Sequence, residues 1–106
     1  MNERQYQNRL IKKLQNLFPD AFIMKNDPRD TQGLPDILIL YRDRWGMLEV
    51  KLAENSAMQP NQAHYVNRFN EMSFASFINP QNEEAVINDL QRSLGLDRNT
   101  RIPQPQ

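Results

Sequence analysis

The sequence of 106 residues contains no cysteine, and only three of its residues are glycine. Without cysteine, disulfide bonds and metal sites built from thiolates are excluded. Long hydrophobic runs are also missing, because the longest unbroken apolar stretch, residues 37–41, is far too short to span a bilayer. The first residues include Glu3 and Arg4 with no apolar stretch behind them, so we expect no signal peptide. These absences favour a cytoplasmic, intracellular protein that is not secreted and does not enter a membrane.

The chain also lacks an excess of charge of either sign, because 13 Lys and Arg residues balance 13 Asp and Glu residues. A neutral chain weighs against strong sequence-independent binding to DNA, which usually relies on surplus basic residues. It does not exclude an enzyme that acts on phosphates, since acidic metal ligands lower the net charge and a bound cation restores positive potential. The 39% of hydrophobic and 25% of charged residues are typical of a globular chain. We expect one domain over residues 1–96 and a flexible C-terminal tail over residues 97–106.

Apolar periodicity predicts the order α-β-β-β-α-β-α. Helices are expected over residues 2–18, 60–72 and 80–94, and strands over residues 21–25, 37–41, 45–51 and 74–78. Asn2 and Gln5 have the spacing of a capping box at the first helix, and Gly95 follows the last helix. The inner stripes of the three helices are expected at Tyr6, Leu10, Leu14 and Leu17 or Phe18, at Tyr65, Val66, Phe69 and Met72, and at Ala85, Val86, Leu90 and Leu94.

The two central strands carry apolar residues on both of their faces, which predicts a sheet covered by helices on both sides. The strand after the second helix is expected to return parallel to its neighbour, through a right-handed crossover. The sequence therefore predicts an α/β fold with a mixed central sheet of about four strands flanked by helices.

Three charged residues are expected to meet at one end of this sheet. The segments 37–41 and 45–51 flank the polar turn Arg42-Asp43-Arg44, which is the pattern of a β-hairpin. The start of the first strand lies beside the end of the second, so Asp36 comes next to Glu49 and Lys51, which share one face. Two carboxylates suit a hard cation such as Mg²⁺, with the backbone carbonyl of Val50 as a candidate third oxygen. The alternative is that these residues form only a structural ion pair at the end of the sheet, with no catalytic role.

The same residues resemble a known motif. Pro35-Asp36, followed after twelve residues by Glu49-Val50-Lys51, resembles the PD-(D/E)xK signature of metal-dependent nucleases. With Gly33-Leu34 in front and Gln62 downstream, residues 1–78 resemble the VRR-NUC branch of that superfamily. The resemblance implies a restriction-endonuclease-like core and an endonuclease that hydrolyses DNA with Mg²⁺ or Mn²⁺.

The resemblance also implies roles for single residues. Asp36 and Glu49 would bind the metal, and Glu3 on the first helix would add an acidic ligand directly or through water. Lys51 would act on the attacking water, while Gln62 would help to place water or the substrate backbone. For Glu3 a stabilising effect on the helix dipole is the alternative, and for Gln62 simple capping of its helix is the alternative.

The substrate is specified less well. Lys25 lies beside the loop that enters the catalytic strand, and Arg29 lies in that loop. Both are candidate contacts to phosphate, and the alternative is that they are plain surface charge. A small nuclease without a reading module suits nicked, flapped or four-way junction DNA by analogy, and a homodimer would cut both strands most easily. His64, the only histidine, has no nucleophile or metal-ligand partner at a suitable spacing. Alternative functions are a non-catalytic module that binds DNA or protein on a nuclease-like fold, and an accessory protein that docks on another factor.

Overall fold

The computed structural model of this chain describes residues 1–27 and 29–96, so the predicted tail lies outside the described residues. The elements follow one another as α1 (Glu3–Leu17), β1 (Phe22–Lys25), β2 (Ile37–Tyr41), β3 (Arg44–Val50), α2 (Pro60–Met72), β4 (Phe74–Ile78) and α3 (Glu83–Ser93). The strands form one sheet in the order β1-β2-β3-β4, in which β3 and β4 are parallel and the other pairs antiparallel. This confirms a mixed α/β architecture with a four-stranded mixed sheet. None of the described helices is both long and apolar enough to cross a bilayer.

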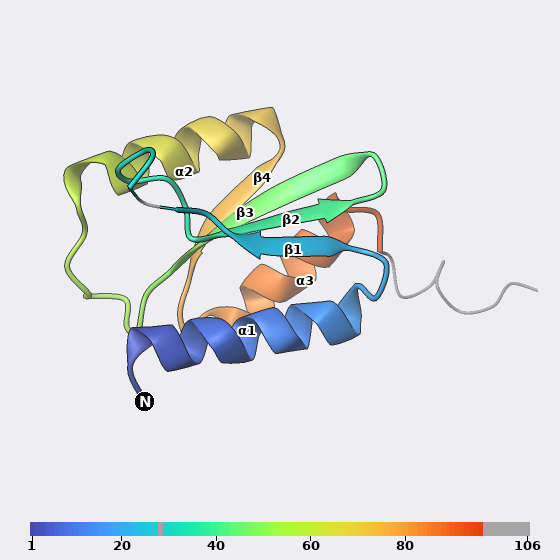
Figure 1. Cartoon of the computed structure of the whole chain (residues 1–106), viewed down its shortest axis with the longest axis horizontal. Helices are drawn as coiled ribbons and strands as arrows, with labels where there is room; N and C mark the ends of the chain where they lie inside the picture. The colour runs from blue at the N-terminus through green and yellow to red at the C-terminus, as the bar shows by residue number, and fades with distance from the viewer. Residues whose placement is uncertain (28, 97–106) are drawn as a thin grey trace, which may run out of the picture.

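Helices cover the sheet unequally (Figure 1). Helices α1 and α3 lie on one face, and α2 lies on the other. The main core fills the space between the sheet and the two helices α1 and α3. Every second residue of β2 and β3 points into this space, and the residues between them face the other side of the sheet. Its fully buried members from the helices and strands are Tyr6, Leu10, Leu14, Phe18, Ile37, Ile39, Leu48, Val50, Ile78 and Leu90.

Two residues of the predicted inner stripes are exposed, so those two predictions are wrong. Met72 is 57% exposed because it is the last residue of α2, where the chain turns toward β4. Ala85 is exposed and Ile87 is buried in its place. Helix α3 starts at Glu83 instead of residue 80, because the side chain of Asn79 accepts hydrogen bonds from the backbone N–H groups of residues 81 and 82 and holds a turn there.

Glu83 connects α1 to α3. The hydroxyl of Tyr6 donates a hydrogen bond of 2.8 Å to one carboxylate oxygen of Glu83, and the ammonium of Lys13 donates one of 2.7 Å to the other. Burial by itself would raise the pKa of Glu83, but these two donors outweigh burial and lower the pKa. Glu83 lies in the first turn of α3, where an acid suits the helix dipole, and it also connects the two helices on the core side of the sheet.

The expectation that both faces of the sheet are fully covered is wrong for β1 and β2. On the face that carries α2, Phe22, Met24 and Leu40 are 61%, 41% and 42% exposed. The pairing of Phe22 with Leu40 makes them neighbours, and Met24 lies two residues along the same face of β1. Helix α2 contacts β3 and β4, so it leaves these three residues open as an apolar strip.

Candidate metal and phosphate site

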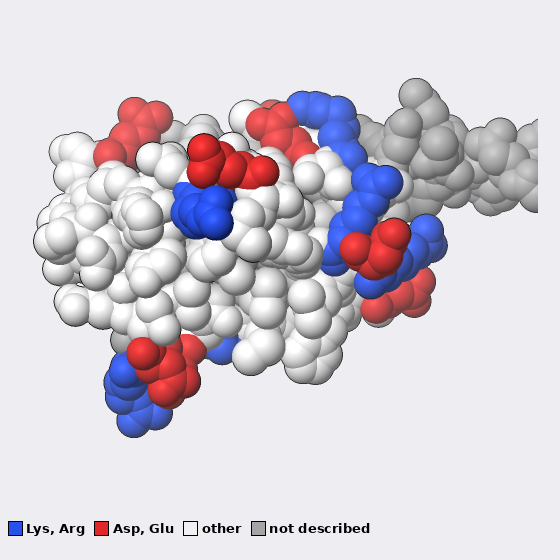
Figure 2. Space-filling view, turned by 90° about the horizontal axis from the view of Figure 1, so that it is seen from above, with Lys and Arg blue, Asp and Glu red and all other residues white. Residues whose placement is uncertain are grey.

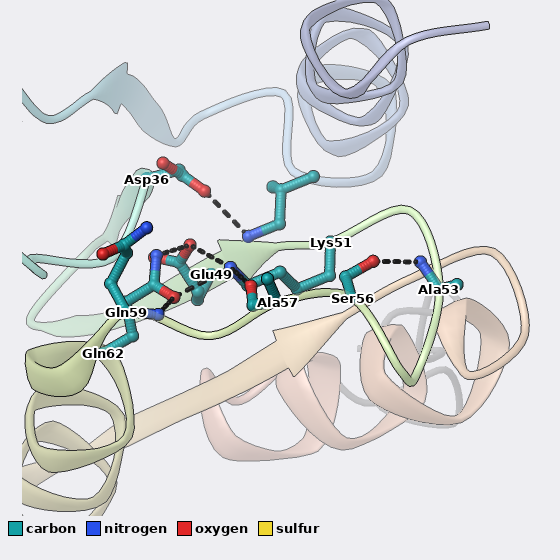
Figure 3. Close-up of polar contacts among 9 residues, drawn as sticks. Asp36, Glu49, Lys51, Ala53, Ser56, Ala57, Gln59 and Gln62 are labelled. Carbon is teal, nitrogen blue, oxygen red and sulfur yellow. Dashed lines mark hydrogen bonds and ion pairs between the residues drawn. The ribbon is translucent and has the colours of Figure 1, made fainter.

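The β2–β3 hairpin brings the two predicted acids together. Its register pairs Ile37 with Leu48, which places Asp36 opposite Glu49 at the end of the sheet. One carboxylate oxygen of Asp36 accepts a hydrogen bond of 2.9 Å from the backbone N–H of Val50 (Figure 3). Asp36 is therefore held in place by the strand that carries its partner, as the hairpin pattern predicted.

Glu49 is the most deeply buried charged side chain of the site, with 2% of its surface exposed. Its Oε2 accepts a hydrogen bond of 2.9 Å from the side-chain amide of Gln62, and the ammonium of Lys51 lies 4.0 Å from the same oxygen. Within residues 1–27 and 29–96, the other oxygen, Oε1, is buried and has no hydrogen-bond partner. An ionised Glu49 is thus only half satisfied by the protein itself.

The surroundings of Glu49 disfavour its charged form. Burial, as the largest cause, and the negative charge of Asp36 together raise the pKa of Glu49 to about 8. A protonated Glu49 can also share a hydrogen bond with Asp36, while Lys51 acts in the opposite direction and Glu3 contributes a weaker repulsion. The repulsion between two adjacent carboxylates raises the pKa of one of them. A cation bound between them would offset this repulsion, as in many functional sites.

Lys51 directly follows β3, and its backbone N–H donates to the carbonyl of Ile78 on β4. Its ammonium donates hydrogen bonds to the side-chain oxygen of Gln62, at 2.8 Å, and to the carbonyl of Ala57, at 3.0 Å. The side chain is 11% exposed and borders a cavity of about 230 Å³ between the 53–58 loop and β4. Because an ammonium has three donors, one N–H remains for a further acceptor.

Gln62 caps its helix, which is one of the two alternatives from the sequence, while its role in placing water or the substrate backbone stays a prediction. Its side-chain oxygen accepts a hydrogen bond of 2.9 Å from the backbone N–H of Gln59, which is half of a capping box at the start of α2. The same oxygen accepts from Lys51, and the amide nitrogen donates to Glu49. Figure 3 shows Gln62 beside these two residues and bonded to both, so the first turn of α2 is connected to the end of β3.

The remaining predicted metal ligands are placed less directly. Glu3 is exposed in the first turn of α1 and lies near enough to Glu49 to raise its pKa. The part of the chain that the structure describes holds no group of three or more His, Asp or Glu side chains suited to one ion. Direct ligation by Glu3 and by the carbonyl of Val50 therefore stays a prediction.

A hard divalent cation fits the donor set that is present. Mg²⁺ is usually held by one or two carboxylates and completes its shell with water and substrate oxygens. Asp36 and Glu49 supply the two carboxylates, and the unpartnered Oε1 of Glu49 is an oxygen that a cation would satisfy. Two carboxylates are thus available to a cation, and metal binding stays a prediction.

The predicted phosphate contacts lie outside this network. The ammonium of Lys25 donates to Asn8 on α1, at 2.6 Å, and the guanidinium of Arg29 is paired with Asp27 at 3.0 Å. His64 is exposed on α2, with its ring edge-on to Tyr65. The structure gives none of these three a contact to Asp36, Glu49 or Lys51.

Sequence reasoning missed two residues that hold the site in place. Asn26 donates from its backbone to the carbonyl of Asp36, at 2.8 Å, and from its side chain to the carbonyl of Pro35, at 2.7 Å. Ala57 contributes the carbonyl that receives the ammonium of Lys51. A backbone carbonyl leaves no mark in a sequence, and an asparagine in a polar loop is too common to single out.

Comparison of this chain with protein-family models, with curated proteins and with solved structures finds no match in any of the three. The resemblance to VRR-NUC nucleases therefore rests on the motif residues alone.

Proposed function

We propose that this chain is a metal-dependent DNA endonuclease of the PD-(D/E)xK type, with a VRR-NUC-like, restriction-endonuclease-like fold. One observation carries the proposal. A buried glutamate, Glu49, faces a second carboxylate and keeps one oxygen without a donor, while Lys51 and Gln62 are fastened beside it. When ionised, this carboxylate is only half satisfied by the protein and destabilises the fold, so its charged form needs a bound cation beside it.

In this proposal Asp36 and Glu49 hold Mg²⁺ or Mn²⁺, with the Val50 carbonyl and Glu3 as further ligands. When bound, such an ion lowers the pKa of water and offsets negative charge on a phosphoryl group. Glu49 must be ionised to bind it, so binding releases the proton that burial and Asp36 hold on this side chain.

The chain's own residues orient the reactants. Lys51 uses two of its donors on Gln62 and Ala57, which leaves the third N–H for water or substrate. In this role Lys51 orients the attacking water or stabilises charge on the phosphate. Gln62 keeps Lys51 and Glu49 at a fixed separation. The water oxygen forms a new bond to phosphorus, the bond to the leaving sugar oxygen breaks, and the water's proton passes through solvent to that oxygen.

The preferred substrate is proposed by analogy with other small nucleases that lack a reading module. We propose nicked, flapped or four-way junction DNA, cut in the cytoplasm by a protein that acts as a homodimer. Arg29, paired with Asp27 in the entry loop, is a candidate phosphate contact that exchanges its partner when DNA binds.

A cleavage assay tests the proposal. The purified chain is incubated with Mg²⁺, Mn²⁺ or a chelator and with linear, nicked, flapped and four-way DNA. We expect cutting that requires metal and that falls by about 100-fold or more in Lys51→Ala and Asp36→Asn. The matched controls are Arg68→Ala and Glu71→Gln, which remove an exposed charge of the same sign from α2, and they should cut like the parent.

Thermal unfolding of each variant separates loss of chemistry from loss of fold. A parent chain that binds DNA but does not cut it with either metal, and whose binding survives both site substitutions, would identify a non-catalytic binding module. Cutting that persists in Lys51→Ala and Asp36→Asn would place the chemistry elsewhere.

A further inference from the structure

Positive charge gathers on α1 although the chain as a whole is neutral. Helix α1 contains four basic residues and one acidic residue, a net charge of +3. Lys13 is neutralised by Glu83, but Arg4, Arg9 and Lys12 have no carboxylate partner among the described residues. On the side of the molecule that carries α2, by contrast, Figure 2 shows a surface made mostly of uncharged side chains.

The exposed surface of α1 is also hollowed. A shallow groove of about 280 Å³ is lined by Gln5, Asn8, Arg9 and Lys12, which all offer hydrogen-bond donors and include no carboxylate. Lys25 extends this surface from β1, because its ammonium donates to the side-chain oxygen of Asn8. These five residues are called the α1 groove below.

One end of the α1 groove lies near the carboxylate site. Lys25 pairs with Ile37 in the β1–β2 register, and the next residue, Asn26, bonds directly to the backbone of Asp36. The first turn of α1 approaches the site as well, because the charge of Glu3 acts on Glu49. One end of the groove is therefore adjacent to the site, and the helix carries the groove away from it.

We infer that the α1 groove binds the phosphate backbone of DNA beside the bond that is cut. The inference rests on the proposed function and extends it, because it assigns the surface that holds the substrate outside the reacting phosphate. Donor side chains with a net positive charge are the usual contacts to the phosphate backbone, and they position DNA without reading its sequence.

The dimensions agree with this assignment. Residues 5 to 12 of a helix span about 10 Å at 1.5 Å per residue. B-DNA has one phosphate per strand for about each 3.4 Å of its axis, so the groove faces about three phosphates. Local concentration of positive charge on α1 explains how a chain of zero net charge can bind a polyanion.

A membrane with anionic lipids could also attract basic side chains, but the α1 groove lacks the apolar flank that membrane-bound helices insert. The exposed apolar strip of Phe22, Met24 and Leu40 lies on the opposite face of the sheet, since Lys25 and the core residue Ile23 face α1. DNA is therefore the polyanion that the surface fits.

A binding experiment with charge-matched variants tests the inference. Lys51→Ala serves as the background so that DNA stays intact in Mg²⁺, and binding to labelled duplex and four-way DNA is followed by anisotropy from 25 to about 200 mM salt. Arg9→Gln with Lys12→Gln should weaken binding about tenfold or more at low salt and reduce the slope of log affinity against log salt by about 2. Arg42→Gln with Arg68→Gln removes the same charge from the hairpin turn and from α2 and should leave both quantities unchanged.

The outcomes separate this inference from the nuclease assignment. Three results would each overturn the inference about the α1 groove. The two double variants could lose DNA affinity equally, Arg9→Gln with Lys12→Gln could lose none, or the background protein could fail to bind DNA. The inference would also be overturned if Arg9→Gln with Lys12→Gln no longer sedimented with anionic vesicles but kept its affinity for DNA. A selective loss of DNA binding in a chain that never cuts would support the groove and refute only the endonuclease.

Discussion

At the scale of single residues, Glu49 shows most clearly how function and stability oppose each other. The side chain is buried next to Asp36, and the ammonium of Lys51 lies 4.0 Å away because Gln62 and Ala57 hold it. Burial and the charge of Asp36 raise the pKa of Glu49 to about 8, although Lys51 acts in the opposite direction. A carboxyl with a raised pKa in the folded state takes up a proton on folding, so its charged form opposes folding unless a cation compensates it.

The metal-free protein should therefore lose stability as the pH rises. Glu49 binds its proton up to about pH 8 when folded and releases it near pH 4.5 when unfolded. Between these values the folded state binds more protons, so the free energy of unfolding falls with pH, by at most about 1.4 kcal/mol per unit. Urea unfolding with a chelator at several pH values between 5 and 8.5 measures this slope.

Two comparisons identify Glu49 as the source of the slope. Glu49→Gln should flatten it, whereas Glu54→Gln, at an exposed position, should keep the slope of the parent. Mg²⁺ should stabilise the parent more at pH 8.5 than at pH 6, because only ionised Glu49 binds it. A parent whose stability is flat or rises over this range would contradict the proposed proton uptake.

At the scale of elements, the site depends on how closely the 26–35 loop approaches α2. Gly33 has a φ of 88°, a region that favours glycine, and a Cβ there would lie 2.5 Å from the Cβ of Asn61 and 2.9 Å from its carbonyl carbon. Asn61 belongs to the first turn of α2, next to Gln62. The loop that positions Asp36 and the helix that positions Gln62 are thus in direct contact.

Gly33→Ala should reduce both stability and cleavage. We expect a loss of about 1–3 kcal/mol, because a left-handed alanine and a clash with backbone atoms are combined, and a lower cleavage rate since the first turn of α2 must move. Gly95→Ala is the matched control. Its φ is 82°, but its Cβ would approach only the Arg44 side chain at 3.3 Å, so we expect about 1 kcal/mol and unchanged cleavage. Urea unfolding and initial rates measure the two effects, and equal cleavage in both variants would contradict the role of the contact.

At the scale of the whole molecule, β1 presents an open edge beside an apolar strip. Asn26 donates toward β2, so the alternation of an antiparallel pair directs the backbone groups of Ile23 and Lys25 away from the sheet. An antiparallel edge is complementary to itself about a two-fold axis, and Phe22, Met24 and Leu40 border it with apolar surface. We propose a second copy of the chain as the occupant of this edge, in line with the predicted homodimer.

The predicted dimer should be weak. Three side chains and one four-residue edge offer less than the roughly 800 Å² per partner of a stable interface. Sedimentation at tens of micromolar should give an average mass between one and two chains, and Phe22→Lys should shift it to one chain. Met58→Lys, which alters an exposed methionine outside the strip, should match the parent. A parent with the mass of one chain throughout would refute the dimer.

Much of the site could be predicted from the sequence because its central contact is local. A hairpin with a short turn fixes which residues face each other, so Asp36 was expected beside Glu49 and Lys51, and the register agrees. The capping-box spacing of Asn2 and Gln5 likewise predicted the start of α1, where both hydrogen bonds form. The failures lie where distant elements meet, as in the contact of Glu83 with Tyr6 and Lys13.

The sequence by itself determined the elements, the pairing of the hairpin and the identity of the charged residues at its end. Periodicity, caps and turns act over a few residues, and a linear pattern records them directly. Only the tertiary structure decided that α2 covers part of one face, that Gln62 bridges Lys51 and Glu49, and that one oxygen of Glu49 lacks a partner. These depend on the docking of helices onto the sheet, where burial and charge are set by neighbours far away in the chain.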